Sequence, residues 1–461
     1  MDQKYLSDDV FEQIKDFNNR DLTKEQKLLI DKLILNEELK ERYNYFGLCK
    51  GCKQINTGHE WCQPCNSKHF QQNFKNWTGE NSDVNKLIQE SQINAKNKNE
   101  ILEWIKYDRF ENVEYITKGG FGTVYRAFWK DGPIEYWNYE TNQWHRNGYS
   151  KDVALKSLNN SKDITTEFLN EINLHLEMNN SLNIVTIYGI TKDPKTNNFM
   201  MVMDYADDGN LRQNLNRNFN WYENFIRLRY IAGGLRDIHK NGLMHQDFHS
   251  GNILGIKNGY FITDLGLCKP ADEKNNNKVY GVLPYVAPEV LRGKKYTQAS
   301  DIYSFGIIIY EVINRLPPYH DMAHDDFLAI KICQGLRPRF NIKVPQLFDD
   351  LVKQCVDADP SKRPNAEYLC ERFNQWQWYR YNKESEISKQ IKEVEEFNEK
   401  QPSFTKSSVN TELTYTTHPQ AIYTSRLLNF NNLPEPKNVD DEVEFSESIE
   451  PIDFTKLNIN S

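Results

Sequence analysis

The sequence that decides the fold is His245-Gln246-Asp247-Phe248-His249-Ser250-Gly251-Asn252, with Asp264-Leu265-Gly266 following it. It contains a carboxylate, a carboxamide and a second carboxylate, at Asp247, Asn252 and Asp264. Phosphoryl-transfer sites use such groups, because one carboxylate orients the attacking hydroxyl while the other two groups hold magnesium ions. We therefore expect Asp247 to be a catalytic base and Asn252 and Asp264 to be magnesium ligands.

Other motifs stand in order on both sides of this stretch: Val153-Ala154-Leu155-Lys156 before it, and Ala287-Pro288-Glu289, the segment from Ser300 to Gly306, and Lys362-Arg363-Pro364 after it. Together they resemble the protein kinase superfamily over residues 108–378. The resemblance implies a two-lobed α+β fold with a sheet-rich N-lobe and a helical C-lobe. It also implies an ATP- and Mg²⁺-dependent enzyme that acts on a protein substrate.

The resemblance assigns a nucleotide site residue by residue. Lys156 would meet the α- and β-phosphates and pair with Glu171, with Glu167 as the alternative partner one helical turn earlier. The other expected nucleotide contacts are the glycine-rich loop at Gly119, Gly120, Gly122 and Val124, the hinge at Met203, Asp204 and Ala206, and Ala154, Asn210 and Leu254. The first glycine of the family's loop is replaced by Thr117. The same resemblance pairs Glu289 with Arg363 and lets Asp301 brace the catalytic loop.

Some positions depart from the family pattern. The residue before Asp247 is Gln246, where the family commonly has an arginine that binds a phosphorylated loop residue. Between Gly266 and Ala287 there is no serine or threonine, and the hydroxyls are those of Tyr280 and Tyr285. We therefore expect this activation segment to be ordered without Ser/Thr phosphorylation.

Two further departures concern the transferred phosphate. His249 and Val282 stand where Ser/Thr kinases carry a lysine and a threonine. His249 is either a partly charged substitute or a packed histidine. The segment Gly281 to Val286, with Ser300 to Gly306, resembles the tyrosine-kinase-like group, which favours Ser/Thr over Tyr as acceptor. The alternative function is a nucleotide-binding pseudokinase that acts as a signalling scaffold.

A cysteine array precedes the kinase-like region. Cys49, Cys52, Cys62 and Cys65 form a C-x2-C-x9-C-x2-C pattern that suits one tetrahedral Zn²⁺ in a zinc-ribbon-like module. A redox dithiol and unmetallated thiols are the alternatives. We expect a structural or protein-docking role. An aromatic insertion, residues 129–149, is predicted to be a surface hairpin that packs its own tryptophans, with a docking site for a protein partner as the alternative.

Composition limits the remaining possibilities. The chain has 461 residues, a net charge of -8 and a pI near 5.8, which argues against nucleic-acid and anionic-membrane binding. No signal-like start or membrane-length apolar run is present, so we expect a cytoplasmic protein. The predicted organisation is a helical segment (1–44), the cysteine module (45–75), a polar linker (76–107), the kinase domain (108–378) and a helical then disordered acidic tail (379–461).

Overall fold

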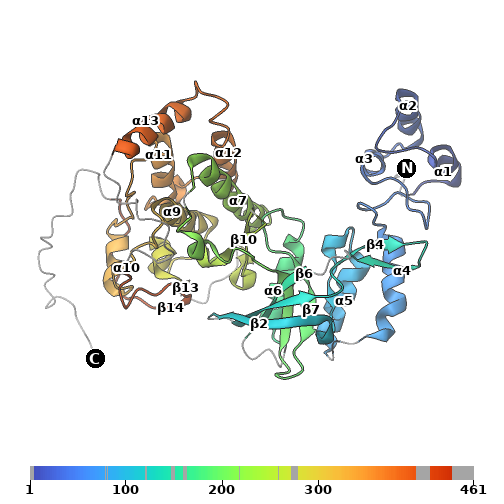
Figure 1. Ribbon diagram of the computed structural model, residues 1–461, viewed down its shortest axis with the longest axis horizontal. Coiled ribbons are helices and arrows are strands. Elements are labelled where there is room, and N and C mark those ends of the chain that lie inside the picture. The colour runs from blue at the N-terminus through green and yellow to red at the C-terminus, as the bar shows by residue number, and fades with distance from the viewer. Residues whose placement is uncertain are drawn as a thin grey trace, which may run out of the picture.

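The computed structural model describes residues 5–77, 79, 81–119, 122–146, 151–158, 164–217, 219–257, 259–270, 279–400 and 416–438. The chain has a sheet-rich N-lobe and a helical C-lobe (Figure 1). This is the α+β architecture that the sequence predicts.

The N-lobe is built on a six-stranded sheet of order β1-β7-β8-β6-β3-β2. Its strands are rich in β-branched and aromatic residues, as strands that pack on a core require. The strands are β1 (Glu103–Trp104), β2 (Phe110–Lys118), β3 (Gly122–Trp129), β6 (Lys151–Leu158), β7 (Ile187–Lys192) and β8 (Phe199–Asp204). The pairing is antiparallel apart from β1 with β7, which is parallel.

Helix α6 (Thr166–Met178) packs on this sheet. It begins at Thr165, whose hydroxyl accepts a hydrogen bond from Phe168 N and so satisfies one of the unpaired amides of the first turn. Phe168 and Ile172 bury their side chains in one core with strands β7 and β8. This packing fixes the face of α6 that points toward β6.

The C-lobe surrounds α9 (Gln298–Asn314), which is buried from Ser300 to Ile313. A helix that is buried on all sides forms the centre of a domain rather than its surface. The helices around it are α7 (Trp221–Lys240), α8 (Pro288–Leu291), α10 (Asp326–Cys333), α11 (Gln346–Cys355) and α12 (Ala366–Trp376). Short 3-10 turns, η4 (Leu211–Asn214), η5 (Ser250–Asn252), η6 (Leu265–Leu267), η7 (Leu283–Tyr285) and η8 (Pro360–Lys362), connect them.

Short strands carry the loops that face the N-lobe. β10 (Ile253–Ile256) and β11 (Gly259–Ile262) form an antiparallel hairpin, and β9 (Leu243–Met244) pairs with β12 (Lys269–Pro270). The stretch from His245 to Asn252 therefore lies between β9 and β10, and Asp264 follows β11 directly.

The N-terminal part has helices where the sequence predicts them, at residues 1–44, and further elements in the segment expected to be a linker. Three helices occur before the cysteine module, namely α1 (Asp8–Ile14), α2 (Lys24–Leu33) and α3 (Glu37–Phe46). The segment expected to be a linker contains α5 (Ser82–Asn94) and β1, and α5 packs beside α4 (Gln63–Asn73). Val84 and Ile88 of α5 are buried in the N-lobe core, which explains why a polar helix is held in place.

The C-terminal part also differs from its prediction. Helix α13 (Glu386–Lys400) is present, as the helical start of the tail predicts. Residues 416–438, however, lie against the C-lobe and include β14 (Arg426–Leu428), which pairs with β13 (Val279–Gly281) (Figure 1). The sequence predicts disorder here because the segment has no periodicity of its own. Its order comes from contacts with the C-lobe. The acidic stretch at 440–444 lies outside the described residues. Among the residues that are described, no helix is long and apolar enough to cross a membrane.

Candidate active site

Lys156 joins the two lobes through a pair of carboxylates. Its ammonium group lies 2.6 Å from Glu171 Oε1 on α6 and 2.9 Å from Asp264 Oδ1 after β11. Burial acts to lower the pKa of Lys156, but the charges of Asp264 and Glu171 outweigh it and raise the pKa above its ordinary value. Lys156 is therefore a permanent cation between the lobes. The side chain of Glu167, the alternative partner, is not among those described.

Gly266 allows Glu171 to approach this close. A Cβ added at Gly266 would lie 2.8 Å from Glu171 Oε2, which is shorter than real contacts of this kind. The glycine of the Asp264-Leu265-Gly266 motif thus leaves room for the carboxylate that holds Lys156. Leu265, which stands where the family has phenylalanine, is buried in the C-lobe core.

Asp301 holds the start of the loop from His245 to Asn252. The two oxygens of this buried carboxylate accept hydrogen bonds from His245 N at 2.9 Å and Gln246 N at 3.1 Å. Gln246 has a φ of 66°, so the chain turns sharply just before Asp247. The predicted bracing role of Asp301 is confirmed by these contacts.

Asp247 and Asn252 lie against each other on that loop. Asn252 Nδ2 donates to Asp247 O at 3.0 Å and lies 3.4 Å from Asp247 Oδ2. This engages the amide nitrogen and leaves the amide oxygen as the ligand atom. Amide and carboxylate oxygens are the ligands that Mg²⁺ prefers, so Asn252 and Asp264 fit a magnesium ion.

Asp247 is buried and ionised. Burial acts to raise the pKa of Asp247, but the neighbouring His249 and a hydrogen bond from Ser425 lower it to about 2. Its Oδ1 atom is buried without a hydrogen-bond partner within the described structure. A buried, charged and partly unsatisfied oxygen is a group to which a hydroxyl proton can be transferred.

His249 is both packed and close to the reacting groups. Its Nδ1 accepts a hydrogen bond from Gly251 N at 3.0 Å, which places the ring proton on Nε2 in the neutral form. Nε2 lies 3.6 Å from Asp247 Oδ2. The structure therefore shows a packed histidine whose buried ring faces Asp247.

The glycine-rich turn joins β2 and β3. Gly119 N donates to Gly122 O at 2.8 Å, and Thr117 and Val124 are paired across the two strands. Val124 is in turn paired with Lys156 on β6, so the strand that follows the turn lies beside the strand of the lysine. Gly120 lies outside the described residues.

The predicted hinge residues occupy the end of β8 and the chain after it. Met203 is paired with Ala154 across the sheet. Asp204 Oδ1 is bound by Tyr188 and Lys151, each at 2.7 Å. Asn210 caps η4 by accepting from Gln213 N, and its backbone bridges to Leu254.

The activation segment is anchored after its undescribed part, residues 271–278. Tyr285 is buried, donates a hydrogen bond to Glu311 Oε2 at 2.6 Å and accepts one from Arg212 at 3.1 Å. Val282 is also buried, and Tyr296 OH donates to Tyr280 O at 2.5 Å. Of the two hydroxyls in the segment, that of Tyr285 is therefore used internally.

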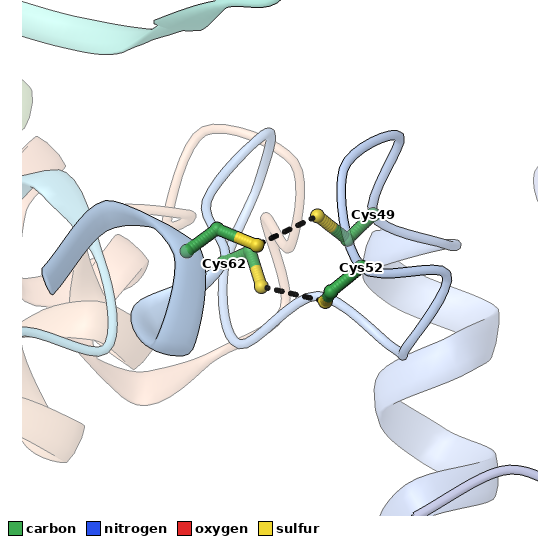
Figure 2. Close-up of side chains that lie close together, drawn as sticks. Cys49, Cys52 and Cys62 are labelled. Atoms are coloured by element: carbon green, nitrogen blue, oxygen red, sulfur yellow. Dashed lines mark hydrogen bonds between the residues drawn. The ribbon is translucent and has the colours of Figure 1, made fainter. Parts of the chain in front are cut away.

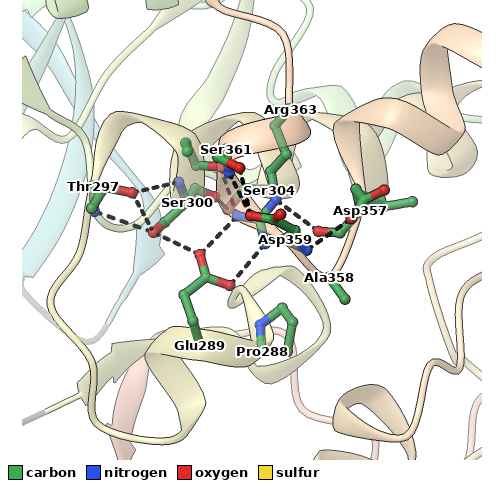
Figure 3. Close-up of polar contacts among 12 residues, drawn as sticks. Pro288, Glu289, Thr297, Ser300, Ser304, Asp357, Ala358, Asp359, Ser361 and Arg363 are labelled. Atoms are coloured by element: carbon green, nitrogen blue, oxygen red, sulfur yellow. Dashed lines mark hydrogen bonds and ion pairs between the residues drawn. The ribbon is translucent and has the colours of Figure 1, made fainter. Parts of the chain in front are cut away.

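Glu289 and Arg363 form the predicted ion pair. The two guanidinium nitrogens lie 2.7 and 2.8 Å from the two carboxylate oxygens, and both residues are buried (Figure 3). Ser300 also donates to Glu289, which ties the start of α9 to α8. A buried, bidentate ion pair of this kind fixes the position of α8, which directly follows the activation segment.

Sequence reasoning missed one residue of the site. Ser425 Oγ donates to Asp247 Oδ2 at 2.5 Å and lies 3.3 Å from His249 Nε2. A serine in a Ser/Thr-rich tail carries no local signal, because its position depends entirely on the path of the tail over the C-lobe.

The four predicted zinc ligands come together in a separate cluster. The sulfur atoms of Cys49, Cys52, Cys62 and Cys65 all lie within 4.8 Å of one another. Figure 2 shows Cys49 and Cys52 on one side of the cluster and Cys62 facing them. Four convergent thiols match the tetrahedral ligand set of a structural Zn²⁺. All eight cysteines of the chain are free thiols.

The aromatic insertion packs on this cluster. It forms a hairpin of β4 (Ile134–Asn138) and β5 (Gln143–Arg146), and Tyr139 OH lies 3.2 Å from Cys49 Sγ. Trp144 stacks on Phe70 with ring centroids 4.3 Å apart, and Trp137 stacks on His69 at 3.7 Å. Trp137 and Trp144 also contact each other, as predicted. The hairpin thus docks the cysteine module of its own chain.

The comparisons with known proteins agree with this geometry. The family described as protein kinase domain matches residues 140–376, which is about half of the chain. The chain therefore belongs to the protein kinase family.

Individual relatives resemble the same region. A probable serine/threonine-protein kinase of Dictyostelium discoideum is 29% identical over 287 residues, which cover 58% of this chain and 20% of that protein. The human mitogen-activated protein kinase kinase kinase 7 is 28% identical over 283 residues, covering 58% of this chain and 42% of that protein. The chain thus matches less than half the length of either relative.

Proposed function

We propose that this protein is an ATP- and Mg²⁺-dependent kinase that phosphorylates serine or threonine hydroxyls of proteins. The observation that carries the proposal is the Lys156 ion pair with both Glu171 and Asp264, beside an ionised Asp247. In protein kinases the Lys–Glu pair and the metal-binding aspartate must both be in place for transfer. The contacts of both Glu171 and Asp264 with Lys156 support this proposal.

Each residue has a stated task in this proposal. Asp247 orients the acceptor hydroxyl and takes its proton, while Lys156 holds phosphate oxygens next to the glycine-rich turn. Asn252 and Asp264 are the ligands for magnesium, which supplies charge neutralisation at the phosphates when it is bound. The hinge backbone near Met203 and Ala206 receives the adenine. His249 directs a polarised N–H toward the transferred phosphate.

The preference for serine and threonine has two supports. The relatives include a probable serine/threonine-protein kinase and mitogen-activated protein kinase kinase kinase 7, and the segment Gly281 to Val286 resembles the substrate loop of Ser/Thr enzymes. We assign the chain to the tyrosine-kinase-like group on the same grounds. Its protein substrate and its cytoplasmic location remain predictions from the sequence.

We also propose that the activation segment needs no Ser/Thr phosphorylation. Gln246 carries no charge to receive a phosphate, and Tyr285 is buried in contacts with Glu311 and Arg212. These contacts of Tyr285 supply the order that a phosphate supplies elsewhere.

A pseudokinase scaffold is the second candidate. Thr117, Gln246, His249 and Val282 favour it, since each replaces a residue that handles phosphate in the family. The complete set of Lys156, Asp247, Asn252 and Asp264 favours the enzyme.

The cysteine cluster adds a structural Zn²⁺ to the proposal. The module has a small core and gains folding free energy from a bound metal. Its aromatic rings contact the β4–β5 hairpin, so the metal would stabilise a platform beside the N-lobe.

The decisive experiment is transfer of labelled γ-phosphate from ATP to a mixed peptide library. Wild-type protein is compared with Asp247→Asn, which keeps the size of the side chain and removes its charge. Transfer by the wild type alone is expected, with label on serine and threonine in phosphoamino-acid analysis. Equal label with both proteins would exclude the enzymatic function.

A further inference from the structure

Residues 416–438 bring a hydroxyl to the catalytic aspartate. Ser425 Oγ donates to Asp247 Oδ2 at 2.5 Å, while His249 Nε2 lies 3.3 Å away. A positioned base must lie within hydrogen-bond reach of the proton that it takes. Ser425 therefore stands where the acceptor hydroxyl of a substrate would stand.

The backbone after Ser425 is bound as an extended peptide. Arg426, Leu427 and Leu428 pair antiparallel with Gly281, Tyr280 and Val279, so β14 adds a strand to the activation segment. Strand addition to an exposed edge is a common way to bind peptides. Figure 1 shows β14 beside β13 at the edge of the C-lobe.

The chain before Ser425 is held by side chains of the C-lobe. Arg212 donates to Tyr423 O at 3.0 Å, and Tyr423 OH donates to Pro318 O at 2.9 Å. The Tyr423 ring also packs edge-on against His324, with centroids 4.8 Å apart. Arg212 also binds Tyr285 of the activation segment, so one side chain contacts both segments.

The chain after β14 is anchored by apolar side chains. Leu428 and Leu433 are only 5% and 9% exposed and belong to the C-lobe core. Arg292 donates to Leu433 O at 3.2 Å and forms an ion pair with Glu435. The hydroxyl of Ser425 is thus located by contacts on both sides of it.

We propose that Ser425 is an intramolecular phosphorylation site and that residues 416–438 are this kinase's own bound substrate. The inference rests on the proposed function. In the reaction, Ser425 Oγ forms a bond to the γ-phosphorus of ATP while the bond from that phosphorus to its bridging oxygen breaks. The electron pair of the broken bond leaves with ADP, and the hydroxyl proton passes to Asp247 Oδ2.

Phosphorylation would then release the segment. The phosphoserine carries a charge of about -1.5 to -2 at neutral pH, and Asp247 beside it is negatively charged. Like charges in a buried site repel, so the product leaves the groove and other proteins gain access to β13. Before transfer, the bound segment excludes them.

The first test follows phosphate on the full chain. Phosphatase-treated protein is given MgATP, and its phosphopeptides are identified by mass spectrometry over a wide range of protein concentration. Phosphate at Ser425 is expected, with a first-order rate constant that does not change with concentration. Ser425→Ala removes this phosphate, while the control Thr424→Ala, at the exposed neighbouring residue, keeps it.

The second test moves the segment without touching the site. Leu428→Asp places a charge in the core, whereas the control Leu427→Asp changes a side chain on the same strand that is 51% exposed. Leu428→Asp should slow Ser425 phosphorylation about tenfold or more and lower the KM for an added serine peptide by a similar factor. Leu427→Asp should behave like the wild type.

The outcomes separate the inference from the proposed function. If the Leu428→Asp protein phosphorylates added peptides but the wild type never modifies Ser425, the segment is an inert plug and the inference is wrong. A rate constant that rises in proportion to protein concentration would show transfer between molecules and would also overturn it. If no variant phosphorylates any target, the proposed function fails, and the inference fails with it.

Discussion

At the scale of single residues, the site is defined by side chains whose partners lie far away in the sequence. Lys156 binds Glu171 and Asp264 across the two lobes, and His249 and Ser425 both contact Asp247. Two substitutions test how these partners act on each other.

The first substitution is His249→Ala. His249 is the strongest of the influences that lower the pKa of Asp247 from 3.8 to about 2, and burial acts in the opposite direction. The variant should therefore have a higher Asp247 pKa, so that the acid limb of kcat/KM moves to higher pH. The pH profiles of both proteins measure this, with His145→Ala on the β4–β5 hairpin as control. An unchanged acid limb would contradict the assignment.

The same pKa shift has a consequence for stability. Because the folded-state pKa is depressed, Asp247 contributes stability that is complete above pH 3.8 and is lost as the pH falls through about 2. In the His249→Ala protein this contribution is expected to be lost at higher pH. Urea unfolding at several acidic pH values measures it.

The second substitution is Gly266→Ala. The new Cβ would lie 2.8 Å from Glu171 Oε2, so Glu171 must move away from Lys156. We expect kcat/KM to fall about tenfold or more, since breaking one partner out of a buried pair costs about 3–5 kcal/mol. A double-mutant cycle with Glu171→Gln provides the control. Fully additive losses would mean that Gly266 acts through something other than Glu171.

At the scale of elements, the activation segment contacts two neighbours. One is the Tyr285 contact with Glu311 and Arg212, and the other is the pairing of β13 with β14. The two tyrosines of the segment should therefore respond differently to loss of their hydroxyls.

Tyr280→Phe should retain activity, because the contact that the structure gives this residue is through its carbonyl oxygen. Tyr285→Phe should lower the free energy of unfolding by about 1–3 kcal/mol, since the buried Glu311 Oε2 loses the hydrogen bond that the Tyr285 hydroxyl donates. Urea denaturation and peptide kinase assays measure the two effects. Loss of activity in Tyr280→Phe would instead indicate tyrosine phosphorylation of the segment.

The helices and strands also show which parts of the fold local sequence patterns can predict. The β-branched and apolar residues at 153–157 predict a strand, and the apolar periodicity at 225–239 and 301–314 predicts two helices. The elements β6, α7 and α9 agree with these predictions, because strong periodicity reflects burial of one face of an element. The segment at 76–107 was predicted less well. Its polar composition suggests a linker, but Val84 and Ile88 provide enough buried surface to hold α5 on the N-lobe.

At the scale of the whole molecule, two further parts of the chain contact the kinase domain. The cysteine module contacts the N-lobe through the β4–β5 hairpin, and the C-terminal segment crosses the C-lobe at the substrate region (Figure 1). The N-lobe and the activation segment of the C-lobe are thus each contacted by a segment from outside the kinase fold.

The metal prediction belongs to this scale. Cys52→Ser should lower the bound zinc measured by elemental analysis, whereas Cys370→Ser, outside the cluster, should not. Loss of the metal should also change tryptophan fluorescence, because Trp137 and Trp144 pack on the module. Stoichiometric zinc in Cys52→Ser would contradict the assignment of these four ligands.

The order of motifs in the sequence was enough to predict the kinase fold, to propose Lys156, Asp247, Asn252 and Asp264 as site residues, and to predict the cluster of four cysteines. These features depend on the order and spacing of motifs, which are local properties of the chain. Only the tertiary structure decided that the hairpin docks the cysteine module and that Ser425 meets Asp247. Both contacts join segments far apart in sequence, and their free energy lies in burial and backbone pairing that neither segment displays alone.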